Sequence, residues 1–121
     1  MLSPVFRTIA TQAVQALVAT RIYGFGSAPQ GVQRPYITWL TVSDAPYEQL
    51  SGPPVGDNDT VQIDCYAGPA DDQEVICVDL AKAVRDALDA AGISNRVVVN
   101  HRETDTKLFR IGLQADFIQS R

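Results

Sequence analysis

A chain of 121 residues has the length of one domain with a real hydrophobic core, and its 20% of charged residues is ordinary for a soluble globular protein. No stretch of roughly 18 uninterrupted apolar residues is present, which excludes a membrane-spanning helix. The first residues also lack the basic and apolar regions of a signal peptide. We therefore expect a single domain over residues 1–121 that is made in the cytoplasm and has no membrane segment.

The charge is divided unevenly along the chain. Residues 1–43 hold three arginines and no acid (+3), residues 44–90 hold eleven acids and two bases (−9), and residues 91–121 hold five bases and three acids (+2), which together give −4. An acidic chain is a poor candidate for direct binding of duplex nucleic acid, which normally requires a basic patch. The uneven charge predicts a polar molecule suited to head-to-tail contact between identical copies; the alternative is that these are simply solvated faces.

Residues 4–18 are predicted to form an amphipathic helix. Ser3 suits the N-cap of this helix, and Pro4 suits its first position. The stripe expected to face the core consists of Phe6, Ile9, Ala13 and Leu17, widened by Val5, Ala10 and Val14. Glycine and proline then interrupt the pattern, so residues 19–35 are predicted to form a connector with little regular structure.

Two strands are predicted next, over residues 36–43 and 60–66. In the second strand, Val61, Ile63 and Cys65 alternate with polar residues and should face the core. The first strand is rich in β-branched and aromatic residues on both faces. Ile37 and Trp39 share one of these faces, and we expect them to make contacts outside the core.

Residues 46–57, between these strands, form a longer loop than compact domains normally use. Loops of more than roughly 12–15 residues without their own secondary structure are uncommon, and they tend to be functional or disordered. This loop carries Tyr47, Leu50 and Val55 among its turn residues, so it is more than a solvated spacer. We expect it to reach a neighbouring copy of the same protein. The candidate interface residues are Ile37, Trp39, Tyr47, Leu50 and Val55.

The clearest helical pattern begins at Asp71. Asp71 and Glu74 have the spacing of a capping box, and acidic residues suit the positive end of the helix dipole. The apolar stripe that follows, to Ala91, consists of Ile76, Leu80, Val84 and Leu88. Gly92 is suited to end this helix in a left-handed conformation.

Two further strands, over residues 96–101 and 107–118, are joined by a polar turn at residues 102–106. One face of the last strand is apolar along its whole length: Phe109, Ile111, Leu113, Ala115 and Phe117. The order α-β-β-α-β-β predicts an α+β fold, with two helices packed on one face of a four-stranded, mainly antiparallel sheet.

The chain has no motif that indicates catalysis, a metal site or a cofactor. Cys65 and Cys77 fall within apolar patterns and are interpreted as buried free thiols, the alternative being a bridge or a metal pair. No serine lies in a nucleophile elbow, and the glycines at 24 and 26 lack the flanking strand and helix of a dinucleotide fingerprint. The alternative of a small enzyme or ligand-binding domain depends on His101, which precedes Glu103 and Asp105 in a segment that fits a hairpin turn better.

A series of short motifs, in order and spacing, resembles the tail-completion or tail-terminator family of long-tailed bacteriophages, of the siphovirus tail-to-head joining type. The resemblance covers about residues 4–118. The motifs are RIY (21–23), APQG (28–31), RPYIT (34–38), LSGP (50–53), VQIDCYA (61–67) and AVRDAL (83–88).

The resemblance implies a structural protein rather than an enzyme. It implies a ring of identical copies, typically a hexamer, that caps the tail tube, stops its polymerisation and presents a surface to head-completion or connector proteins. Such a ring lies in the virion neck, and genomic DNA passes through its lumen without specific binding, which a net negative charge favours. The alternative within the same class is another neck, head-completion or minor tail component.

Overall fold

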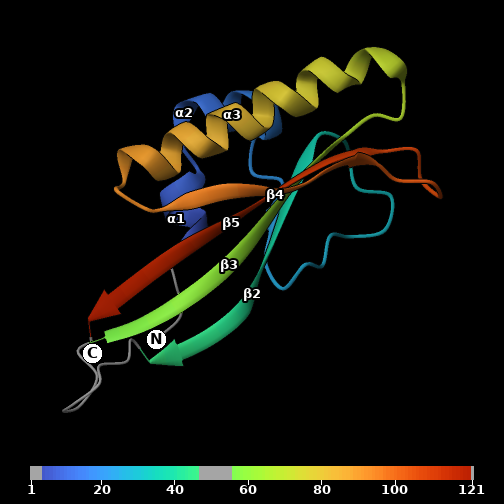
Figure 1. Ribbon diagram of the computed structural model, residues 1–121. Helices are drawn as coiled ribbons and strands as arrows, with labels where there is room; N and C mark the ends of the chain where they lie inside the picture. Colours follow the sequence, from blue (N-terminus) through green and yellow to red (C-terminus); the bar gives the residue numbers. More distant parts are fainter. Residues whose placement is uncertain (1–3, 47–55, 121) are drawn as a thin grey trace.

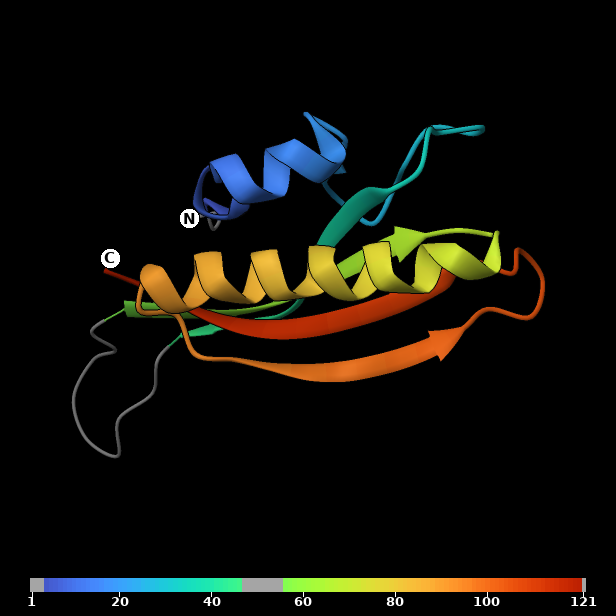
Figure 2. The same cartoon turned by 90° about the horizontal axis from the view of Figure 1, so that it is seen from above.

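The computed structural model describes residues 4–46 and 56–120, and within them the chain forms a five-stranded sheet with its helices on one face (Figures 1 and 2). The helices are α1 (Val5–Ile9), α2 (Gln12–Val18) and α3 (Glu74–Ala90), and a 3-10 turn, η1 (Asp71–Gln73), leads into α3. The strands are β1 (Ile22–Tyr23), β2 (Tyr36–Pro46), β3 (Gly56–Ala67), β4 (Asn95–Arg102) and β5 (Phe109–Ser120). The predicted α+β class is confirmed. Among the described helices, none has the length and apolar character needed to cross a bilayer.

The strands lie in the order β1-β2-β3-β5-β4, with β1 parallel to β2 and every other neighbouring pair antiparallel. The prediction of four strands missed β1, which lies inside the expected connector. β1 pairs through two residues only, Ile22 opposite Ile37 and Tyr23 opposite Thr38. So short a strand has no alternating pattern in the sequence. The strand order places β1 and β2 at one edge of the sheet and β4 at the other.

The single helix predicted for residues 4–18 is broken in the structure between α1 and α2. Thr11 has an extended backbone (φ −76°, ψ 169°), and its hydroxyl oxygen accepts a hydrogen bond from the Val14 amide at 3.4 Å. Thr11 is therefore the N-cap of α2, a role that its short polar side chain fills better than a place in a helix interior. The predicted cap, Ser3, lies outside the described residues.

The break also changes which residues face the core. The buried residues of α1 and α2 are Val5, Ile9, Val14 and Val18. Phe6 and Ala13, predicted to lie in the buried stripe, are exposed instead. Because the helix is interrupted, the helical periodicity starts anew in α2, and an apolar stripe predicted for one continuous helix does not match the buried residues of both.

α3 covers β3 and β5, with α1 and α2 along one of its flanks (Figure 2). Its predicted stripe is buried at Leu80, Val84 and Leu88, and Gly92 follows it with the expected positive φ of 73°. The predicted capping box is wrong, because no side chain caps α3 and the η1 turn occupies the place of its first turn. The Asp71 carboxylate pairs with Arg102 instead, at 3.0 Å.

The core lies between the helices and one face of the sheet. All but one of the strand residues predicted to face it are buried, which confirms the alternation in β3 and β5: Val61, Ile63, Cys65, Ile111, Leu113, Ala115 and Phe117. Burying a side chain of this size contributes roughly 1.5–3 kcal/mol to stability. The exception, Phe109, is partly buried and packs against the core.

The two cysteines belong to this core as free, buried thiols, as predicted. The Cys77 thiol donates to the Cys65 carbonyl oxygen at 3.4 Å. Burial raises the pKa of Cys77 to about 11 and raises that of Cys65 as well. Both thiols are therefore protonated at neutral pH and unreactive.

β4 is an edge strand with an irregular pairing. Val97 lies opposite Leu113 and Val99 opposite Gly112, so the intervening Val98 has no partner on β5 and forms a bulge. Val97 and Val98 are both exposed. The bulge divides the strand into two short regular segments.

Candidate assembly surfaces

Three predicted interface residues, Tyr47, Leu50 and Val55, lie outside the described residues. The strands on either side are longer than predicted, because β2 continues to Pro46 and β3 begins at Gly56. The interval between the two strands is therefore residues 47–55 and not 46–57.

The interval joins β2 to β3 in the chain at an end of the sheet that has only three strands. β2, β3 and β5 run side by side to that end, where Gly56 pairs with Ser120, whereas the pairing of β4 with β5 stops at Ala115 (Figure 1). Figure 1 shows these three strands leaving the layer covered by α3. The end of the sheet is thus an extension that projects away from the helices.

The expectation that Ile37 and Trp39 lie on an outer face is wrong. Ile37 pairs with Cys65 and Trp39 with Ile63, and both partners belong to the core, so this face of β2 is the one that the helices cover. Ile37 is 0% exposed and has no surface to offer to a partner. Because β2 is apolar on both faces, its sequence gives no sign of which face is covered.

Trp39 is only partly buried, and it supports an exposed aromatic turn at residues 24–27. Phe25 in this turn is 84% exposed and stacks on Trp39, with ring centroids 6.2 Å apart. Its φ of 59° lies in the left-handed region, which is uncommon for a bulky residue. Glycine on each side permits the conformation: a Cβ at Gly24 would lie 3.0 Å from the Trp39 ring, and Gly26 has a φ of 62°. The Gly26 amide donates to the Trp39 carbonyl at 2.8 Å and fixes the turn to β2.

Trp39 also lines a shallow hollow of about 380 Å³ together with Phe6, Arg7 and the start of α1. Phe6 is 42% exposed, and Arg7 brings a positive charge to the same place. We call Phe6, Phe25 and Trp39 the aromatic edge. It lies at the β1–β2 side of the sheet.

A groove lies between α3 and β4, at the opposite side of the sheet from the aromatic edge. It contains two hollows of about 170 Å³ each, and Val78, Asn100 and Ile111 line both of them. One of the two, which we call the α3–β4 hollow, is completed mainly by Ala81, Val97 and Leu113, together with Lys82 and Arg85. Its lining is thus largely apolar with two cations.

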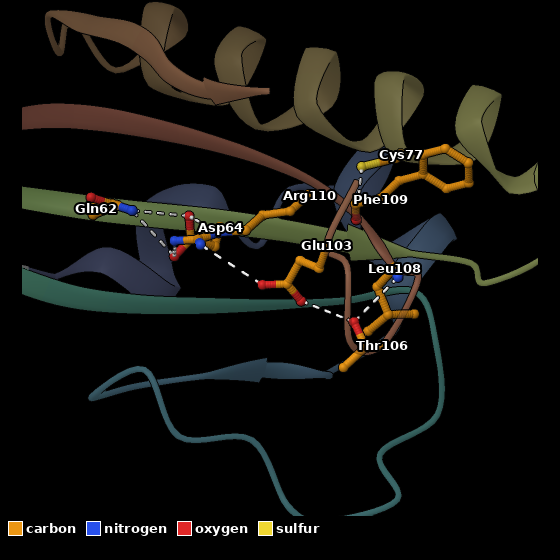
Figure 3. Close-up of polar contacts among 8 residues, drawn as sticks. All are labelled: Gln62, Asp64, Cys77, Glu103, Thr106, Leu108, Phe109 and Arg110. Atoms are coloured by element: carbon orange, nitrogen blue, oxygen red, sulfur yellow. Dashed lines mark hydrogen bonds and ion pairs between the residues drawn. The ribbon is translucent and has the colours of Figure 1, made fainter. Parts of the chain in front are cut away.

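A polar cluster occupies the sheet face that carries no helix (Figure 3). Asp64, on β3, is only 3% exposed, and both of its carboxylate oxygens accept from the Arg110 guanidinium at 3.3 Å. The Gln62 amide donates to the same carboxylate at 3.1 and 3.4 Å. Glu103 lies 3.9 Å from Arg110 on its other side. This set of partners compensates the desolvation of a buried carboxylate.

Gly112 and Tyr66 adjoin this cluster. A Cβ at Gly112 would lie 2.5 Å from an Asp64 carboxylate oxygen and 3.2 Å from Val99, so only glycine leaves room for the carboxylate. Tyr66 stacks on Tyr36 with centroids 4.9 Å apart. Burial, followed by the negative charge of Asp64, raises the pKa of Tyr66 to about 12.

The residues around His101 do not form a catalytic or metal-binding arrangement. His101 is exposed on β4, and Glu103 turns towards Arg110 instead of joining it. Thr106 donates to Glu103 and accepts from the Leu108 amide, so the turn is held by its own side chains (Figure 3). Within residues 4–46 and 56–120, no three His, Cys, Asp or Glu side chains are placed to hold a metal ion.

Sequence reasoning missed the aromatic turn and the α3–β4 hollow. The turn has a signal, a phenylalanine between two glycines in a segment without apolar periodicity. The hollow has none, because its walls come from a helix and a strand whose own patterns predict only their buried faces.

A model of the family described as tail completion protein gp17 matches residues 5–120. No curated protein matches the chain. Among solved structures, the chain is similar to one in the virion of a native gene transfer agent particle, with a TM-score of 0.70 and 19% sequence identity. That likeness covers 97% of this chain and 92% of the other, so the two share a fold over nearly their whole length.

Proposed function

The chain belongs to the tail completion protein gp17 family and has a structural role in a phage tail, and we propose that its copies close into a hexameric ring. The ring caps the tail tube at the head-proximal end, in the virion neck. It stops the polymerisation of the tube and offers a joining surface to head-completion or connector proteins. Each copy acts as a single domain, and assembly takes place in the host cytoplasm.

One observation supports a ring above other arrangements: the two edges of the sheet carry unlike surfaces. The aromatic edge projects a phenyl ring, and the α3–β4 side is hollowed. Contact between unlike patches is heterologous, and a heterologous contact closes into a ring when the rotation between copies allows it. A single self-complementary surface would instead favour a two-fold dimer.

The residues proposed to contact neighbouring copies or the tube are Tyr47, Leu50, Val55 and Trp39. Trp39 remains a candidate because its ring reaches the surface of the aromatic edge. The first three lie in the interval that follows the projecting end of the sheet, a position from which a loop can reach beyond its own subunit.

The proposal is tested by measuring mass and tube growth with the same preparation. We expect light scattering across a concentration series to give a species near six times 13.1 kDa, either for the free protein or after addition of tube ends. Added to growing tail tubes, the protein should arrest their elongation, as seen by electron microscopy, while tubes without it lengthen. Tubes that continue to elongate with the protein bound would reject the capping function.

A further inference from the structure

We propose that the ring is closed by Phe25 of one copy inserting into the α3–β4 hollow of the next copy. The inference rests on the proposed ring, and it names the two surfaces that meet. Both surfaces belong to every copy, at opposite edges of one sheet, so each copy can give one contact and receive one.

Phe25 has the properties of a preformed contact. Its ring makes a stacking contact with Trp39 yet remains 84% exposed, so it buries little surface within its own chain. The hydrogen bond from Gly26 to Trp39 and the flanking glycines hold the turn in a left-handed conformation that points the residue outward. A side chain that is already ordered loses little conformational freedom on binding, and aromatic residues are enriched at protein interfaces.

The α3–β4 hollow matches a phenyl ring in size and chemistry. Its volume is about 170 Å³, and an apolar cavity of about 150 Å³ is known to accommodate benzene. Val78, Ala81 and Val97 provide apolar walls. Lys82 and Arg85 line the same hollow, and cations of this kind are attracted to the face of an aromatic ring.

The hollow itself is lined by two cations, but the segments that carry the two surfaces have opposite net charges, which favours a second copy as the occupant. Residues 1–43 carry three arginines and no acid, and Arg7 adjoins the aromatic edge. Residues 71–90 carry six acids and two bases, a net charge of −4, and Asp79 lies on the exposed side of α3. Opposite charges steer two such surfaces together and disfavour pairing of like with like.

Cross-linking of two single-cysteine variants tests the contact directly. Ser27→Cys and Val98→Cys, at exposed positions near Phe25 and near the hollow, leave both contact surfaces intact. The two variants are mixed and treated with a short bis-maleimide, while the native thiols stay unreactive because they are buried. We expect a cross-linked heterodimer in the mixture and no cross-linked product from the wild type. Absence of the heterodimer, or an equal yield of Ser27→Cys homodimer, would overturn the inference.

A second pair of variants gives an independent readout. Phe25→Ala removes the projecting ring, and Val97→Trp fills the hollow; each alone should raise the protein concentration needed for assembly by roughly 30-fold. Mixed together, they should stop at a heterodimer, because only one intact contact can form per pair. Val98→Trp, on the adjacent exposed bulge residue that does not line the hollow, is the matched control and should assemble normally.

The outcomes separate this contact from the ring itself. If wild-type protein forms hexamers but no cross-linked heterodimer is found and the variants assemble at the wild-type concentration, the ring stands and this contact is rejected. If the heterodimer forms but no assembly larger than a dimer appears under any condition, including on tube ends, the contact stands and the ring is rejected.

Discussion

Gly112 lies beneath the Asp64 carboxylate on the sheet face that carries no helix. We expect Gly112→Ala to destabilise the protein by about 1–3 kcal/mol, because the new methyl group overlaps the carboxylate and presses on Val99. Urea unfolding measures the change. In an Asp64→Ala background the cost of Gly112→Ala should fall, since the overlapping oxygen is gone. Equal costs in the two backgrounds would show that the carboxylate is not the cause.

Tyr66 makes the stability of the protein sensitive to alkaline pH. Its pKa is about 12 in the folded state and about 10 in an unfolded chain. Between these values the unfolded state binds fewer protons than the folded state, so stability falls as pH rises through pH 10 to 12. Because Tyr66 is partly exposed, we discount the full shift and expect a loss of about 1–2 kcal/mol.

Tyr66→Phe isolates this effect, since it keeps the stacking surface and removes the proton. Unfolding midpoints at pH 9 and pH 11.5 should diverge less for the variant than for the wild type. The buried cysteines titrate equally in both proteins and cancel in the comparison. An identical alkaline loss in the two proteins would assign it to other groups.

At the scale of elements, the break between α1 and α2 depends on one side chain. Thr11→Ala removes the hydroxyl that accepts from the Val14 amide, and we expect a loss of about 0.5–1 kcal/mol. Thr11→Ser keeps the acceptor and is the matched control. Thermal unfolding followed by circular dichroism measures both. A Thr11→Ala variant as stable as the wild type would mean that the packing of Val14 and Val18 alone sets the start of α2.

Elements with one unbroken apolar period were predictable from the sequence, and the others were not. The stripe of α3 and the alternation of β3 and β5 follow directly from burial on one face. The prediction of one N-terminal helix was wrong because the sequence does not distinguish a threonine that caps a helix from a polar residue inside one. The prediction of which face of β2 is exposed was wrong because both faces are apolar, and only the packing of the helices determines which one is buried.

The candidate surfaces follow the same division. Trp39 could be selected as an aromatic residue on a strand, but its partner Phe25 lies in a segment without periodicity. The Asp64–Arg110 pair joins two strands that are distant in sequence, and the β3–β5 register alone brings Tyr66 opposite Arg110 and Asp64 opposite Gly112. Nothing in a single sequence specifies that register.

For the whole molecule, the interval 47–55 should be needed for assembly and dispensable for folding. Its replacement by Asn-Gly gives, together with Gly56, a three-residue hairpin loop between the paired residues Pro46 and Asp57, and it leaves every described strand pair in place. We expect the thermal unfolding midpoint to change by only a few degrees and the hexamer to be lost, as measured by light scattering. Hexamers of normal mass in this variant would remove Tyr47, Leu50 and Val55 from the proposed contacts.

The assembled ring should not retain DNA. Six copies of a chain with a net charge of −4 repel phosphate over distances of about a Debye length. Fluorescence anisotropy of a labelled duplex should stay constant on addition of the protein, even at low salt. Binding that weakens as salt is added would indicate a basic lumen and would contradict the proposed passage of the genome.

The bulge at Val98 has a consequence for how the protein behaves at high concentration. A regular, exposed edge strand offers a continuous row of amide and carbonyl groups on which another strand can add, and this is a route to fibres. In β4 the row is interrupted at Val98 and flanked by the charged side chains of Arg96 and Arg102. The edge is therefore a poor template for endless strand addition. The protein is proposed to stop the growth of the tail tube, and its own edge strand is built so that it does not start the growth of a fibre.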